Sequence, residues 1–146
     1  MNILVTGAKG FIGQNLCVHL KEAGFENIQT ITRNDNDKTI DEKVKSADFI
    51  YHLAGINRPE DDSEFKKGNT DLTEKIIDTL ISNERNTPIL LTSSIKADLQ
   101  NPYGISKAGA ELAIAAYRKK TGSSAYIYRL PNVFGKWCKP NYNSAV

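Results

Sequence analysis

Short apolar segments rich in β-branched residues alternate along the chain with longer segments in which apolar residues recur every three or four positions. The short segments predict buried strands, and the longer ones predict amphipathic helices. The strands are expected at 2–6, 28–32, 49–53, 89–92 and 125–129. Because alternating strands and helices join into right-handed crossovers, this order predicts a parallel sheet in an α/β fold.

The helical pattern is supported by residues that commonly end helices. Helices are expected at 11–23, 40–45, 71–83 and 103–120. Gly24 and Gly122 follow the first and the last of them, where a residue in the left-handed conformation often caps a helix.

Three glycines spaced by three residues join the first predicted strand to the first predicted helix. Gly7 permits a tight turn, Gly10 lets backbone amides approach a phosphate, and Gly13 lets the helix lie close to the strand. Unpaired amides and the helix dipole favour an anion at this end of a helix. The sequence therefore predicts a doubly wound (Rossmann) sheet that binds the pyrophosphate of a dinucleotide. The residues expected to do so are Gly7, Lys9, Gly10, Phe11, Ile12 and Gly13.

The last residues of the chain show neither the pattern of a strand nor that of an amphipathic helix. Residues 136–146 predict a loop, whereas a doubly wound sheet usually continues beyond five strands and needs a wall for its substrate. We therefore expect residues 1–135 to form the dinucleotide-binding domain. Residues 136–146 are expected to lead to a substrate-binding region that this chain does not contain.

Composition narrows the range of partners. The 146 residues include nineteen basic and seventeen acidic side chains, for a formal net charge of +2, without a basic block. Nucleic acid is therefore not an expected partner. No apolar run reaches the roughly eighteen residues of a membrane span, and the chain starts with a core strand rather than a signal peptide, so we expect a cytoplasmic protein with no membrane partner.

The cysteines and histidines do not indicate a metal site. Cys17 and Cys138 have no Cys or His beside them at metal-ligand spacing, so we expect free thiols. His19 and His52 are expected to be surface or packed side chains rather than catalytic ones.

Tyr103 and Lys107 are four residues apart in the last predicted helix, so their side chains share one face. An ammonium beside a phenol favours the phenolate, and such a tyrosine can exchange a proton with an alcohol or a ketone near neutral pH. The same spacing also occurs on solvated helices. Ser94 follows the fourth strand at its carboxyl end, where doubly wound sheets bind ligands. Its hydroxyl can bind the same carbonyl oxygen, or can simply cap a turn.

The end of the second predicted strand bears on the choice between NAD and NADP. In NAD enzymes an acidic residue about twenty positions beyond the glycine loop binds the ribose 2′-hydroxyl. Arg33 stands at that position here, and its guanidinium can bind a 2′-phosphate, with Lys9 as a second positive charge. Asp35 and Asp37 lie slightly further on and leave NAD open as the alternative. We expect NADP(H).

Taken in this order, the glycine loop, Ser94, Tyr103 and Lys107 resemble the short-chain dehydrogenase/reductase superfamily, in its extended, nucleotide-sugar-modifying branch. Matching motifs lie at 51–55, 68–70 and 129–135. The segments 54–60, 101–104 and 134–144 are similar to the reductase half of CapF-type enzymes of bacterial capsular polysaccharide and O-antigen synthesis. The resemblance covers the whole chain.

The resemblance implies NADPH-dependent reduction of a UDP-linked 4-keto-6-deoxy-N-acetylhexosamine, leading to N-acetyl-L-fucosamine, in proteins that also carry a C-terminal cupin epimerase. It implies Tyr103 as the proton donor, Lys107 as the group that activates it and holds the nicotinamide ribose, and Ser94 as the group that orients the 4-keto oxygen. Further residues implied at the site are Leu53, Ala54, Gly55 and Asn69 along the cofactor, Pro131 near the nicotinamide and Asn132 near the sugar.

Two other functions remain open, namely a nucleotide-sugar 4-epimerase with bound NAD and a non-catalytic dinucleotide-binding scaffold. A dehydratase is disfavoured because residues 94–96 read Ser-Ile-Lys where dehydratases have Thr-Asp-Glu.

The resemblance also implies a homodimer through the helices at 71–83 and 103–120. Burial of the same side chains against the chain's own sheet is the alternative. The side chains concerned are Ile76, Ile77, Leu80, Ala108, Ala113 and Ala116.

Overall fold

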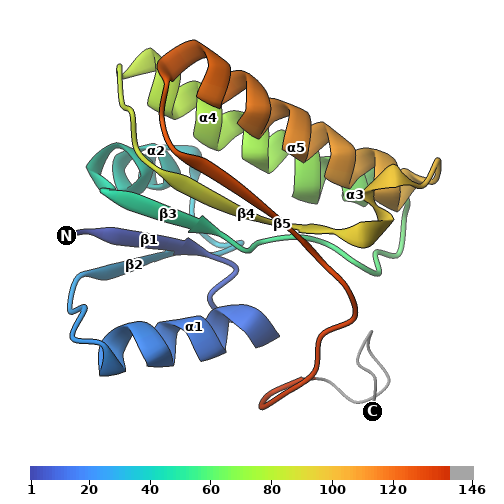
Figure 1. Ribbon diagram of the computed structural model, residues 1–146, viewed down its shortest axis with the longest axis horizontal. Coiled ribbons are helices and arrows are strands. Elements are labelled where there is room, and N and C mark those ends of the chain that lie inside the picture. The colour runs from blue at the N-terminus through green and yellow to red at the C-terminus, as the bar shows by residue number, and fades with distance from the viewer. Residues whose placement is uncertain (139–146) are drawn as a thin grey trace.

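The computed structural model describes residues 1–138, and within them it shows a five-stranded parallel sheet with helices on both faces (Figure 1). The strand order is β2-β1-β3-β4-β5, so the direction of winding reverses between β1 and β3. The strands are β1 (Ile3–Thr6), β2 (Ile28–Ile31), β3 (Phe49–His52), β4 (Ile89–Ser94) and β5 (Ala125–Leu130). This arrangement confirms the predicted doubly wound fold.

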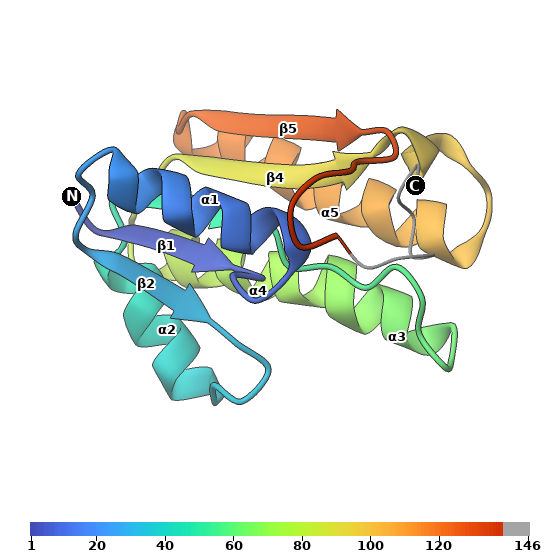
Figure 2. The ribbon, with the colours of Figure 1, turned by 90° about the horizontal axis from the view of Figure 1, so that it is seen from below.

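The helices divide unequally between the two faces of the sheet. Helix α1 lies alone on one face, while α2, α4 and α5 cover the other (Figures 1 and 2). The helical segments are α1 (Phe11–Glu22), α2 (Asp37–Ser46), α3 (Ser63–Phe65), the π-helix η1 (Lys66–Asp71), α4 (Leu72–Ser82), the 3-10 helix η2 (Ile95–Asp98) and α5 (Pro102–Thr121).

Side chains alternate across β1 and so supply both cores. Leu4 points to the larger core with Ile50 and Ile114, whereas Ile3 and Val5 pack under α1 with Leu20. All residues of β1 are buried, as a parallel strand covered on both faces requires.

The predicted boundaries agree with the observed ones to within three residues. Gly24 and Gly122 have the positive φ expected beyond a helix end, +86° and +73°. The prediction did not include α3 and η1, which extend the helical path N-terminally from α4. The weakly patterned helix at 40–45 is longer than predicted, because Asn36 caps it by accepting a hydrogen bond from the amide of Thr39 at 2.9 Å.

The proposed dimer residues have different surroundings. Ile76, Ile77 and Leu80 lie in the chain's own core, as the alternative interpretation had it. On α5, Ala108 and Ala113 are half-buried and Ala116 is exposed.

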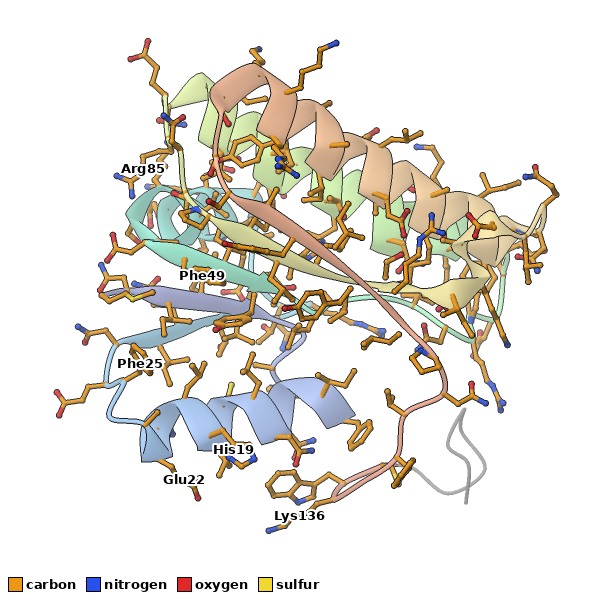
Figure 3. The ribbon with its side chains drawn as sticks, viewed as in Figure 1. His19, Glu22, Phe25, Phe49, Arg85 and Lys136 are labelled. Atoms are coloured by element: carbon orange, nitrogen blue, oxygen red, sulfur yellow. The ribbon has the colours of Figure 1, made fainter. Side chains whose placement is uncertain are left out.

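The segment after β5 returns toward the start of α1, where Figure 3 shows Lys136. The side-chain amide of Asn15 donates to the carbonyl oxygen of Lys136 at 2.8 Å, which fixes the segment there. The predicted loop at 136–146 lies outside the described residues from 139 onward. Along the described part of the chain, no helix has the length and apolar character needed to cross a bilayer.

Candidate active site

The glycine turn at the end of β1 is closed by contacts that exclude side chains. The amide of Gly10 donates to the carbonyl oxygen of Gly7 at 2.9 Å, and Gly7 has a φ of +69°. A Cβ on Gly13 would overlap that same carbonyl oxygen, so glycine is required there for α1 to approach the strand. Gly10 precedes the helix without a side-chain cap, which leaves the first-turn amides of α1 to an anion.

Two cavities meet beside this turn. An outer cavity of about 540 Å³ is bounded by the glycine turn, the end of β2 and η1. An inner cavity of about 330 Å³ is bounded by the carboxyl end of β4, the start of α5 and the segment after β5. Leu53 and Gly55 line both, so the two form one continuous cleft at the carboxyl ends of the strands.

Most of the predicted site residues line this cleft. Gly7, Lys9, Gly10, Arg33 and Ala54 line the outer cavity. Ile12, Ser94, Tyr103, Lys107, Pro131 and Asn132 line the inner one. The topology thus brings together predicted residues that are up to 125 positions apart in the chain, 7 and 132.

Three predicted cofactor residues do not line either cavity. Gly13 packs on the glycine turn, and the ring of Phe11 lies against Gly135. The side chain of Asn69 is buried and binds the backbone of Ile56, accepting from its amide at 2.9 Å and donating to its carbonyl oxygen at 3.1 Å. It also donates to the hydroxyl of Ser106 at 2.9 Å. Asn69 therefore joins the loop after β3 to α5.

The prediction missed five polar residues of the inner cavity, namely Asn57, Thr92, Ser93, Lys96 and Asn101. Thr92 and Ser93 lie at the carboxyl end of β4, and Asn57 and Lys96 follow the carboxyl ends of β3 and β4 within a few residues. That position was the available signal, because ligands of doubly wound sheets bind at this edge.

Lys107 is a buried amine at the floor of the inner cavity. The residue is 6% exposed, and its Nζ donates to the carbonyl oxygen of Thr92 at 3.3 Å. Burial lowers the pKa of Lys107 to about 8, and the negative charge of Glu111 acts in the opposite direction. A Cβ on Gly55 would lie 2.9 Å from this Nζ, so the glycine makes room for the amine.

Ser94 and Tyr103 face the same cavity from β4 and α5. The Oγ of Ser94 accepts from the amide of Lys96 at 3.1 Å, which is the capping role considered above. Because that bond uses an oxygen lone pair, the hydroxyl proton can still be donated to a ligand. The ring of Tyr103 packs edge-on against Phe65, with 5.6 Å between the ring centroids.

His52 is buried between two threonines beneath the cleft. Its Nδ1 lies 2.7 Å from the hydroxyl of Thr6, and its Nε2 lies 2.8 Å from the hydroxyl of Thr73. Burial lowers the pKa of His52 to about 3, and the charge of Lys107 acts in the same direction. His52 is therefore neutral and packed, while His19 lies on the surface of α1 beside Glu22 (Figure 3).

Asp35 lines the outer cavity, and its carboxylate is engaged by Lys43 of α2 and by Thr32 at the end of β2. Its carboxylate accepts hydrogen bonds from Lys43 at 2.6 Å and from the amide and hydroxyl of Thr32 at 2.7 and 2.9 Å. The hydrogen bond from Lys43 is the largest influence that lowers its pKa to about 2. Asp37 pairs with Lys75 and lines a groove between α2 and α4 instead of the cleft. Arg33 is exposed at the outer cavity.

The cysteines are free thiols, and no group of three or more His, Cys, Asp or Glu side chains suited to a metal ion is found among residues 1–138.

Comparison with known proteins gives consistent matches along the chain. A family model described as the NAD dependent epimerase/dehydratase family matches residues 3–146. A UDP-2-acetamido-2,6-beta-L-arabino-hexul-4-ose reductase from Pseudomonas aeruginosa is 51% identical over 146 residues, covering 100% of this chain and 39% of the relative.

The fold also matches solved structures. The crystal structure of the capsular polysaccharide assembling protein CapF from Staphylococcus aureus is 47% identical, with a TM-score of 0.83 over 99% of this chain and 39% of that one. A UDP-glucuronic acid 4-epimerase from Bacillus cereus, solved with NAD, is 22% identical with a TM-score of 0.80 over 97% of this chain and 60% of that one. At this identity the second structure shows a shared fold alone. The chain spans about 39% of the length of its two more similar relatives.

Proposed function

The chain belongs to the NAD-dependent epimerase/dehydratase family, in agreement with its motifs, and from this premise we propose that it is the cofactor-binding and proton-donating part of an NADPH-dependent reductase. The substrate proposed is a UDP-linked 4-keto-6-deoxy-N-acetylhexosamine of capsule or O-antigen synthesis. Residues 1–135 would form the NADP(H)-binding domain, in a cytoplasmic protein.

One observation carries the proposal. Ser94, Tyr103 and Lys107 line an inner cavity that is continuous, through Leu53 and Gly55, with the cavity at the glycine turn. A dinucleotide whose pyrophosphate lies on the turn can therefore extend one end toward Arg33 and the other toward Tyr103. The turn fits such a ligand because its backbone leaves no space for side chains at Gly7 and Gly13.

The residues of the inner cavity supply what a carbonyl reduction requires besides a reductant. Bound NADPH supplies a hydride for the carbonyl carbon. The phenol of Tyr103 gives its proton to the carbonyl oxygen, so that the C=O group becomes a secondary alcohol. The ammonium of Lys107 stabilises the phenolate left on Tyr103, and the hydroxyl of Ser94 holds the carbonyl oxygen during transfer.

The surroundings of Arg33 support NADP(H) over NAD(H). Asp35 lines the outer cavity beside Arg33, but its carboxylate already accepts hydrogen bonds from Lys43 and Thr32. Asp37 pairs with Lys75 outside the cleft. Arg33 and Lys9 line the outer cavity and provide positive charge for a 2′-phosphate.

The substrate class is supported by the relative from Pseudomonas aeruginosa, whose name describes a reductase of a UDP-linked hexul-4-ose. All of this chain matches 39% of that relative's length, so the same type of 4-keto sugar is the first to test.

We also propose a homodimer that uses the exposed face of α5. Ile105 and Leu112 are 57% and 71% exposed and lie two helical turns apart, on the side that carries the exposed Ala116.

The decisive experiment is an assay of NADPH oxidation by the full-length protein with a panel of UDP-linked 4-keto and 4-hydroxy sugars. We expect oxidation with the 4-keto-6-deoxy-N-acetylhexosamine, and a loss of about 100-fold or more in Tyr103→Phe with cofactor affinity retained. Tyr126→Phe, on the exposed surface of β5, is the matched control. Interconversion of 4-hydroxy epimers without net NADPH use would indicate an epimerase. Cofactor binding without turnover of any sugar would indicate a scaffold.

A further inference from the structure

Four side chains form a connected polar cluster that reaches the inner cavity through Ser93. Glu111 accepts a hydrogen bond from the hydroxyl of Ser93 at 2.5 Å. Arg129 donates to both oxygens of Glu111, from Nε at 2.9 Å and from Nη2 at 2.7 Å. The Nη1 of Arg129 donates to both oxygens of Asp98 at 2.9 and 2.8 Å.

This cluster connects the elements that carry the candidate active site. Ser93 precedes Ser94 on β4, and Glu111 follows Lys107 by one turn of α5. Arg129 lies on β5, two residues before Pro131. The bidentate pair of Glu111 and Arg129 therefore holds α5 against the end of the sheet at the level of the proposed catalytic groups.

The two carboxylates of the cluster differ in exposure. The side chain of Glu111 is 12% exposed, whereas that of Asp98 is 74% exposed. Burial raises the pKa of Glu111, but the hydrogen bonds from Arg129 and Ser93 outweigh it and bring the pKa below its ordinary value. Glu111 is thus a fixed negative charge at neutral pH, while solvent screens the charge of Asp98.

Glu111 also acts on the amine of Lys107. Burial of Lys107 favours the neutral amine, and the charge of Glu111 favours the ammonium. The other groups near Lys107 supply no negative charge. His52 on β3 is neutral, the backbone of Thr92 on β4 offers a carbonyl oxygen, Tyr103 lies on the same helix, and Arg129 on β5, bound to Glu111, is positive.

We propose that Glu111, held by Arg129 and Ser93, is a positioning residue that keeps Lys107 protonated and fixes α5 against β4 and β5 at the active site. Its importance for turnover depends on the proposed function, whereas its effect on the charge of Lys107 does not.

The test is the pKa of Lys107 in Glu111→Gln, measured in the intact protein without cofactor. NMR of the lysine Cε and Hε signals reports it, with Lys107→Arg used for assignment. We expect the pKa of Lys107 to fall by roughly one unit. The alkaline limb of the NADPH affinity profile should move to lower pH by a similar amount.

The sign of the shift separates this role from a purely structural one. Looser packing of α5 would admit water to Lys107 and raise its pKa toward the ordinary 10.5. An unchanged or raised pKa in Glu111→Gln would overturn the proposal. Glu111→Asp, which retains the charge, should restore most of the wild-type value.

Asp98→Asn is the matched control, because it removes a carboxylate from Arg129 and leaves Glu111 in place. It should not change the pKa of Lys107. If Glu111→Gln does not fold, Glu111→Met gives the same measurement with Arg129 still paired to Asp98, and it should also lower the pKa of Lys107. A lowered pKa in a protein that reduces no sugar would support the role of Glu111 and count against the proposed function alone.

Discussion

His52 donates a hydrogen bond from Nε2 to the hydroxyl of Thr73, 2.8 Å away. The direction follows from the next contact, because the single proton of that hydroxyl already goes to the carbonyl oxygen of Asn69 at 2.6 Å. Nδ1 is then an acceptor, and it receives the hydroxyl proton of Thr6 at 2.7 Å. Thr6 in turn accepts from the amide of Ala54 at 3.0 Å. The neutral imidazole of His52 thus joins the end of β1 to η1. All four hydrogen bonds run in the same direction, from the amide of Ala54 to the carbonyl oxygen of Asn69.

Acidification should destabilise the protein through His52. Its pKa is about 3 in the folded state and about 6.5 in the unfolded chain, so only the unfolded chain takes up a proton between these values. The contribution of His52 is complete above pH 6.5 and is lost as the pH falls. We expect a loss of about 1.4 kcal/mol in the free energy of unfolding for each pH unit in this window.

Urea unfolding at pH 7 and pH 5 measures this effect. His52→Gln should be less stable at pH 7 but should have a flatter pH dependence, since no imidazole remains to be protonated. His19→Gln, on the exposed surface of α1, should retain the wild-type slope. Equal slopes in wild type and His52→Gln would show that His52 does not titrate as described.

Gly55→Ala should impair both cofactor binding and stability. The added Cβ would lie 2.9 Å from both the Nζ of Lys107 and the Oδ1 of Asn69, so the amine must move. The lysine chain is flexible, but Asn69 is buried and held by three hydrogen bonds, so we also expect a loss of about 1–2 kcal/mol in the free energy of unfolding. NADPH titration and urea unfolding of the same samples separate the two quantities.

Gly24→Ala provides a control in which stability alone changes. Its Cβ meets no atom within 4 Å, but its φ of +86° is unfavourable for alanine. It should cost about 1 kcal/mol of stability and leave cofactor affinity unchanged. If Gly55→Ala bound NADPH as tightly as wild type, the position of the Lys107 amine would not matter for binding.

Arg33→Ser should reduce the preference for NADPH. Loss of a charge-assisted bond to the 2′-phosphate should weaken NADPH binding by about 10- to 100-fold and leave NADH binding nearly unchanged. Fluorescence titration with each cofactor measures both affinities. Arg118→Ser, on α5 outside the cleft, is the control for a change of net charge. Tighter binding of NADH than of NADPH by the wild type would refute the proposed preference.

Leu112→Glu should disrupt the proposed dimer. Leu112 is 71% exposed on α5, and burying a carboxylate in an apolar interface is unfavourable. Light scattering after size exclusion should show a dimer for wild type and a monomer for Leu112→Glu. Val18→Glu, at an exposed position of α1, should remain a dimer. A monomeric wild type would remove the basis of this interface.

Features that depend only on residues close together in the sequence were predictable. Buried β-branched strands, the glycine turn and the tyrosine–lysine spacing are local features, and the rule for parallel sheets then places Ser94 and Tyr103 at one edge. The order of the strands and the continuity of the two cavities required the structure.

Other features depend on contacts between distant segments, which a single sequence does not display. The ion pair between Asp35 and Lys43 joins the loop after β2 to α2, and no local pattern indicates it. The path from α3 through η1 into α4 was missed because its residues are mostly polar and lack a repeating apolar face. Glu111 and Arg129 are eighteen residues apart, and no sequence pattern connects them. Their ion pair forms because α5 and β5 are adjacent in the fold.

The close packing of Gly13 on Gly7 limits how the turn can be re-engineered. Neither glycine tolerates even a methyl group, whereas Lys9 is exposed and free of that restriction. A protein engineer who wishes to change cofactor preference should therefore randomise position 9 together with the loop after β2. Gly7 and Gly13 should be left unchanged in such a library.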